Sequence, residues 1–139
     1  YSIFLYAQPT EALVFKVLIV EDVAETREYL RVLLDGAETQ GHRLTVSGVA
    51  QNGAEARLEM DRRRPDIVLL DEILPGESSV DVLRDAREAG IPVLLMTSTE
   101  HPTHAAAPGA VGRVIKPGWE EREREAAEFV RSVFSAVRP

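Results

Sequence analysis

Four short apolar runs shape what this chain can fold into, because each run ends in residues that carry chemistry. The runs cover residues 16–20, 66–70, 93–96 and 114–115, and they are rich in Val, Ile and Leu. Runs this short and this apolar are typical of strands buried on both faces, as in a parallel sheet. Ligands of open parallel sheets bind just outside the carboxyl ends of the strands. We therefore expect the residues that follow the four runs to meet at one edge of a sheet.

Helical patterns alternate with these strands, since apolar residues recur between them at helical spacing. Helices are predicted over residues 26–37, 54–64, 79–89 and 119–137. A polar loop is predicted over residues 37–43, followed by a further strand over residues 44–50. This alternation predicts an α/β fold with a five-stranded parallel sheet, helices on both faces and right-handed crossovers.

Two segments depart from the regular alternation. The segment from Glu100 to Gly109 contains Pro102 and Pro108, which are unfavourable inside a helix, so the fourth helix is predicted to be shortened or irregular. Residues 1–13 are predicted to be an N-terminal arm that is disordered or foreign to the domain, which would then cover residues 14–139.

Composition narrows the classes of function. A chain of 139 residues is enough for one domain. Its net charge of −7 argues against a grip on nucleic acid or anionic lipid by charge alone. The absence of cysteine excludes disulfides and thiolate metal sites and fits a reducing cytoplasm. No apolar stretch approaches the length of a membrane span.

The residues after the strands form a set suited to phosphoryl chemistry. Glu21, Asp22 and Asp71 are carboxylates, Thr97 offers a hydroxyl and Lys116 offers an ammonium. Carboxylates serve as nucleophiles towards phosphoryl groups, and a cation must offset the repulsion between them. Each residue also has an ordinary interpretation, because acids cap helices, threonine favours strands and lysine is common on surfaces. Their order and their equivalent positions at strand ends favour the functional interpretation.

The acids also predict the cation. Mg²⁺ prefers oxygen ligands, keeps several waters and takes only one or two carboxylates. Asp22, Asp71 and a backbone carbonyl just after Asp71 would form such a site, with Glu21 holding a bound water.

The chain resembles the receiver domain of two-component response regulators over residues 15–137. The matching motifs are residues 17–22, 71–76, 97–98 and 109–110, the last leading to Lys116-Pro117. The resemblance implies a flavodoxin-like, doubly wound fold with five parallel strands. It implies that a sensor histidine kinase or histidine phosphotransfer protein passes a phosphoryl group to Asp71 with Mg²⁺, in a cytoplasmic phosphorelay.

The resemblance also assigns roles to single residues. Thr97 would turn inward to the phosphoryl group and Lys116 would pair with it, while the Lys116–Pro117 bond would be cis. Glu21, Asp22, Asp71 and the backbone carbonyl of Ile73 would bind the metal. Such a domain is a signalling module that catalyses only its own phosphorylation and dephosphorylation. Its output would be a shift in a face that binds a downstream protein or a second copy of the chain, with no direct contact to nucleic acid or membrane.

Two residues depart from the receiver pattern, and two more bear on the loss of the phosphoryl group. Arg113 stands where Tyr or Phe is usual, and Ser79 stands where glycine is common. Ile73 and Thr99, two residues beyond Asp71 and Thr97, offer no acid or amide to align water. We therefore predict slow self-dephosphorylation.

Other functions fit the sequence less well. A receiver-fold scaffold that binds partners without phosphorylation remains the alternative, favoured by Arg113 and opposed by the intact set of acids, Thr97 and Lys116. A phosphatase of the haloacid dehalogenase type would need an acid where Ile73 stands. His101 and His104 are spaced to share a metal, but the neighbouring proline favours an ordinary loop.

Overall fold

A computed structural model describes residues 13–74, 79–97, 109–117 and 123–137 of the chain. In chain order the elements are β1 (Val14–Val20), α1 (Ala24–Leu34), β2 (Glu38–Thr39), β3 (His42–Ala50), α2 (Gly53–Arg62), β4 (Ile67–Asp71), α3 (Ser79–Glu88), β5 (Val93–Thr97), β6 (Ala110–Ile115) and α4 (Glu123–Val137). The strands form one sheet in the order β2-β3-β1-β4-β5-β6.

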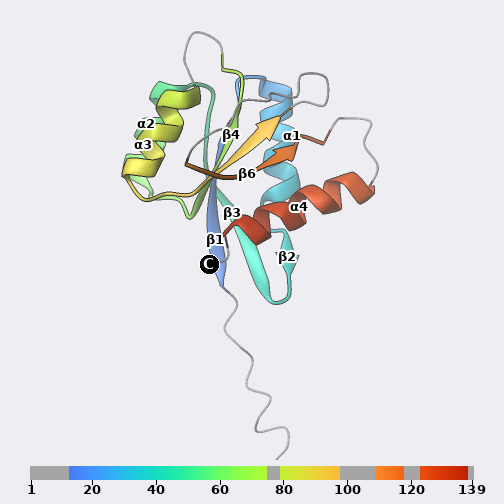
Figure 1. The fold of residues 1–139 in the computed structure, drawn as a ribbon. Coiled ribbons are helices and arrows are strands. Elements are labelled where there is room, and N and C mark those ends of the chain that lie inside the picture. The colour runs from blue at the N-terminus through green and yellow to red at the C-terminus, as the bar shows by residue number, and fades with distance from the viewer. Residues whose placement is uncertain (1–12, 75–78, 98–108, 118–122, 138–139) are drawn as a thin grey trace, which may run out of the picture.

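The five longer strands, β3, β1, β4, β5 and β6, run parallel to one another, which confirms the predicted sheet. Strands β4 and β5 are buried at every position, as expected for central strands covered on both faces. Helices α2 and α3 pack on one face of the sheet, and α1 and α4 pack on the other (Figure 1). The doubly wound arrangement predicted from the sequence is therefore confirmed.

The sixth strand, β2, corrects the prediction of a polar loop over residues 37–43. β2 pairs antiparallel with the start of β3, in a hairpin that turns at Gln40 and Gly41. Both turn residues have positive φ, of 49° and 80°, as tight hairpin turns require. The segment is too short and polar to show strand periodicity, so its turn geometry and its pairing with β3 determine the strand.

Local signals set the ends of two helices. The Asn52 side chain accepts a hydrogen bond from the Glu55 amide at 2.9 Å and so caps the start of α2. The Glu55 side chain accepts one from the amide of Gln51, the residue before the cap, at 3.1 Å. After α3, Gly90 has φ 74° and the Ile91 amide donates to the Ala86 carbonyl at 2.8 Å. This left-handed glycine ends the helix and returns the chain to β5.

Several predictions fall on residues that the structure does not describe. They include nearly all of the arm at residues 1–13, the fourth helix near residues 100–108, and Thr99, His101, His104 and the start of the helix predicted at Trp119. Within the described ranges, no helix is long and apolar enough to cross a membrane.

The central strand β4 should dominate stability. Leu69 is fully buried in it, so Leu69→Ala should lower the free energy of unfolding by about 2–5 kcal/mol through lost burial and the cavity left behind. Urea unfolding measures this loss. Leu58→Ala is the control, because Leu58 on α2 is 64% exposed and its truncation should change stability by less than about 0.5 kcal/mol. Equal losses in both variants would contradict this view of the core.

Candidate functional site

The carboxyl ends of β1 and β4 lie side by side and bring three acids together. Glu21 and Asp22 directly follow β1, and Asp71 is the last residue of β4. One carboxylate oxygen from each of these residues lies within 4.8 Å of the others. Glu21 is fully buried and Asp71 is 6% exposed, so water screens their charges poorly. The predicted gathering of these acids at one sheet edge is what the structure shows.

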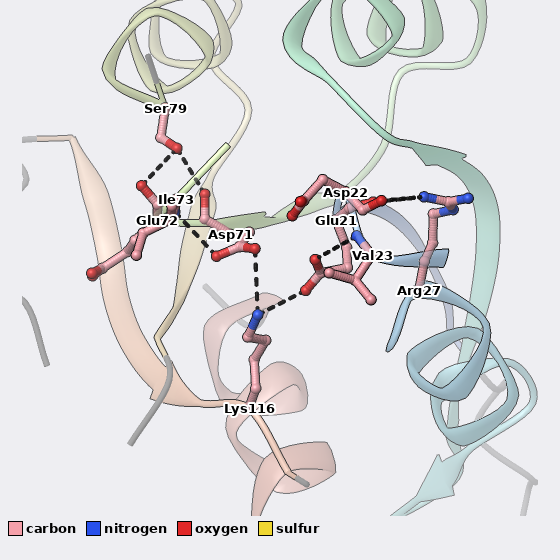
Figure 2. A network of polar contacts seen from close by, with 9 residues as sticks. All are labelled: Glu21, Asp22, Val23, Arg27, Asp71, Glu72, Ile73, Ser79 and Lys116. Carbon is pink, nitrogen blue, oxygen red and sulfur yellow. Dashed lines mark hydrogen bonds and ion pairs between the residues drawn. The ribbon is translucent and has the colours of Figure 1, made fainter. Parts of the chain in front are cut away.

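Lys116 reaches this cluster from the far side of β5. Its Nζ lies 2.8 Å from Glu21 Oε1 and 3.3 Å from Asp71 Oδ2 (Figure 2). Burial alone lowers the pKa of the Lys116 ammonium, but its hydrogen bonds and charge interactions with the two acids outweigh burial and raise the pKa. The ammonium therefore stays charged and joins β6 to the ends of β1 and β4.

Asp22 shows the cost of placing acids together. Burial raises the pKa of Asp22, and the hydrogen bond and negative charge of Glu21 raise it further. A nearby cation stabilises carboxylates that are crowded and partly buried in this way. Their oxygen atoms are the ligands that Mg²⁺ prefers. The donor set of Glu21, Asp22 and Asp71 therefore fits a divalent metal.

Arg27 of α1 fixes the turn that carries the first two acids. Its Nη1 donates to the Glu21 carbonyl at 2.9 Å and to the Asp22 carbonyl at 3.3 Å (Figure 2). The Val23 amide also donates to Glu21 Oε2 at 3.1 Å. Arg27 was not predicted to make this contact. Its position just after the acids, in the first turn of α1, is the only signal in the sequence.

The turn after Asp71 is held in a similar way. The Ile73 amide donates to Asp71 Oδ1 at 3.1 Å. The Ser79 hydroxyl lies 2.8 Å from the Asp71 carbonyl and 2.9 Å from the Glu72 carbonyl (Figure 2). In the sequence Ser79 is a departure from glycine and a possible helix cap, and the structure gives it these two carbonyl partners.

Thr97 ends β5 at the same edge of the sheet and is 9% exposed. Its carbonyl accepts a hydrogen bond from the Lys116 amide at 2.9 Å, which ties the end of β5 to the residue that carries the ammonium. The prediction of a cis bond between Lys116 and Pro117 is wrong, because the described residues contain no cis peptide bond. The Lys116–Pro117 peptide bond is trans.

Comparison with known proteins assigns the class that this fold and site define. The family model for the response regulator receiver domain matches residues 17–128. The chain therefore belongs to the receiver domain family of two-component response regulators, and it is a signalling module of that kind.

Two curated relatives show the range of proteins that contain such a domain. The chain is 36% identical over 134 residues to protein-glutamate methylesterase/protein-glutamine glutaminase 5 of Myxococcus xanthus, covering 88% of this chain and 37% of the relative. It is also 36% identical over 84 residues to the DNA-binding response regulator MtrA of Mycobacterium tuberculosis strain H37Rv, covering 60% of this chain and 34% of the relative. The chain thus spans about a third of the length of these relatives.

Solved structures agree with the fold. The response regulator domain of Thermotoga maritima CheB matches with a TM-score of 0.71 and 25% identity, covering 91% of this chain and 99% of that one. A structure of the P1 domain of CheA3 in complex with CheY6 from R. sphaeroides matches with a TM-score of 0.71 and 26% identity, covering 88% of this chain and 95% of that one.

Burial of Asp22 and its repulsion by Glu21 predict that Asp22→Asn stabilises the metal-free protein at neutral pH, by no more than about 1 kcal/mol because solvent screens this partly exposed carboxyl. A carboxyl whose pKa is raised by folding stabilises at acidic pH, and that contribution is lost as the pH rises through the folded-state pKa. The gain from Asn should therefore shrink as the pH falls through the raised pKa of Asp22 and should vanish below the pKa of an ordinary aspartate. Urea unfolding with a chelator, at several pH values, measures it. A loss of stability at neutral pH would contradict the repulsion.

Proposed function

We propose that this receiver domain accepts a phosphoryl group on Asp71 from a sensor histidine kinase or a histidine phosphotransfer protein. The observation that carries the proposal is the position of Asp71, a nearly buried carboxylate with an ammonium 3.3 Å away and two further acids beside it. The complex of CheA3 P1 with CheY6, a protein of similar fold, supports a partner of this class.

The chemistry follows from the groups present. A carboxylate oxygen of Asp71 attacks the phosphorus of the donor, forming a P–O bond as the P–N bond to the donor imidazole breaks and its electron pair stays on the nitrogen. The Lys116 ammonium then leaves its contact with Asp71 to pair with a phosphoryl oxygen, and the Thr97 hydroxyl donates to another. Both groups stand at the strand ends next to Asp71.

Glu21, Asp22, Asp71 and the backbone carbonyl of Ile73 would hold Mg²⁺ in this proposal. The bound cation would offset the negative charge that the acids and the phosphoryl group share. Arg27 supports the same function by fixing the carbonyls of Glu21 and Asp22.

The proposed output is a change in protein binding. The bound phosphoryl group carries about −1.5 to −2 charges and replaces the single negative charge of the Asp71 carboxylate. This change in charge and shape shifts the populations of forms that differ at the end of β5 and along β6. In the cytoplasm, a downstream protein or a second copy of the chain would bind one of these forms more tightly than the other. We propose no direct contact with nucleic acid or with a membrane.

Acetyl phosphate tests the acceptor directly. With Mg²⁺ the protein should gain the mass of one phosphoryl group, and Asp71→Asn or chelation of the metal should abolish the gain. Asp61→Asn is the matched control, because Asp61 is exposed near the end of α2 and should not affect the reaction. A mass gain that persists in Asp71→Asn would contradict the assignment of the acceptor.

A phosphorylation-independent scaffold is the second candidate. It is favoured by Arg113, which stands at the usual aromatic position and forms an ion pair with Glu72. The same experiment separates the two, because a scaffold would show no mass gain that depends on Asp71.

The side chain at residue 73 should control how long the phosphoryl group stays. Ile73 is 56% exposed beside Asp71 and offers no polar group to orient water. Ile73→Asn should therefore speed loss of the phosphoryl group by about tenfold, less than full acid–base catalysis gives, since an amide only aligns the water. A phosphate-release time course measures the rate, with Ile73→Val as the apolar control. An unchanged or lower rate in Ile73→Asn would contradict the proposal.

A further inference from the structure

An ion pair crosses the sheet next to the phosphoacceptor. Arg113 of β6 places its Nε 2.6 Å from Oε1 of Glu72, the residue that follows Asp71. Strands β4 and β6 are not neighbours, because β5 lies between them. The pair therefore joins two strands over the end of a third.

The pair is less exposed than an ordinary surface contact. The Glu72 side chain is 8% exposed and that of Arg113 is 32% exposed. A carboxylate that is this shielded from water loses more than an exposed one when its cationic partner is removed. The Glu72 amide also donates to the Met96 carbonyl at 3.1 Å, so the backbone of Glu72 is fixed to β5 and its side chain to β6.

The position of the pair links it to the site. Glu72 lies between Asp71 and Ile73, within the turn whose carbonyls Ser79 also binds. Arg113 lies on the strand that leads to Lys116, three residues further on. The contact between Glu72 and Arg113 thus spans the same gap, from β6 to the end of β4, that the Lys116 side chain spans to reach Asp71.

We propose that Arg113 is a positioning residue that acts through Glu72 to hold the Asp71 turn and β6 at the spacing that phosphoryl binding requires. The proposal rests on the proposed function of Asp71 and adds a residue to it. At the position that is usually aromatic, this chain would carry an arginine whose ion pair with Glu72 holds two strands in place; we call this ion pair the brace.

A simpler explanation makes a different prediction. If Arg113 and Glu72 acted only by their charges, removing the cation would weaken binding of an anion at Asp71 and removing the anion would strengthen it. A brace requires both partners, so loss of either should weaken binding, and loss of both should be no worse than loss of one.

Binding of beryllofluoride with saturating Mg²⁺, measured by calorimetry, distinguishes these cases. Arg113→Ala and Glu72→Gln should each weaken the affinity by about three- to tenfold, and the double variant should match the weaker single one. Arg113→Lys should recover part of the loss, because it keeps a cation near Glu72. Urea unfolding of every variant separates lost binding from lost folding.

Arg43→Ala is the matched control. Arg43 forms a contact with Glu38 whose Nη2–Oε1 distance is also 2.6 Å, but both side chains are more than half exposed and belong to the hairpin of β2 and β3. Its removal should leave the beryllofluoride affinity unchanged.

Three results would overturn the brace while leaving the proposed function intact. They are opposite effects of Arg113→Ala and Glu72→Gln, unchanged affinity in both, or additive losses in the double variant. Failure of the unmodified protein to bind beryllofluoride in a manner that depends on Asp71 would instead contradict the proposed function, and the brace with it.

Discussion

The rest of the site depends on the contacts that the Lys116 ammonium makes with two buried acids. The ammonium lies 2.8 Å from Glu21 and 3.3 Å from Asp71, and it is the group that faces both acids from β6. A fully buried carboxylate such as Glu21 is costly without a cation beside it. One lysine therefore holds together the ends of three strands, and it does so at the place where a phosphoryl group would need a positive charge.

The parallel sheet makes this contact available. Because β1, β4, β5 and β6 all point the same way, their carboxyl ends deliver acids, a hydroxyl and an ammonium to one edge. The backbone contacts of Arg27 and Ser79 then fix the two turns that carry the acids. Burial, and then the neighbouring Glu21, raise the pKa of Asp22 at this edge, which fits the cation that we propose for the site.

The sequence predicted the strands and helices that have a clear apolar pattern, and the acids that directly follow a strand. The buried runs, the alternating helices and the gathering of Glu21, Asp22 and Asp71 were all visible in it. Strand β2 was not predicted, because two polar residues are too few to show the alternation that is typical of a strand. The backbone contacts of Arg27 were not predicted either, although its partners lie only five and six positions away. The partner of Arg113 was not predicted, since side chains that are 41 positions apart in the sequence leave no local pattern. The cis bond inferred from resemblance at Lys116 was wrong.

A magnesium titration followed by amide NMR tests the electrostatic basis of the site most directly. If three carboxylates share a cation here, the largest changes should centre on residues 21–23 and 71–73 and on Lys116, and Asp22→Asn should weaken them strongly. Changes scattered over the exposed acids of the helices, or the same response in Asp22→Asn, would show that no metal binds at this edge of the sheet.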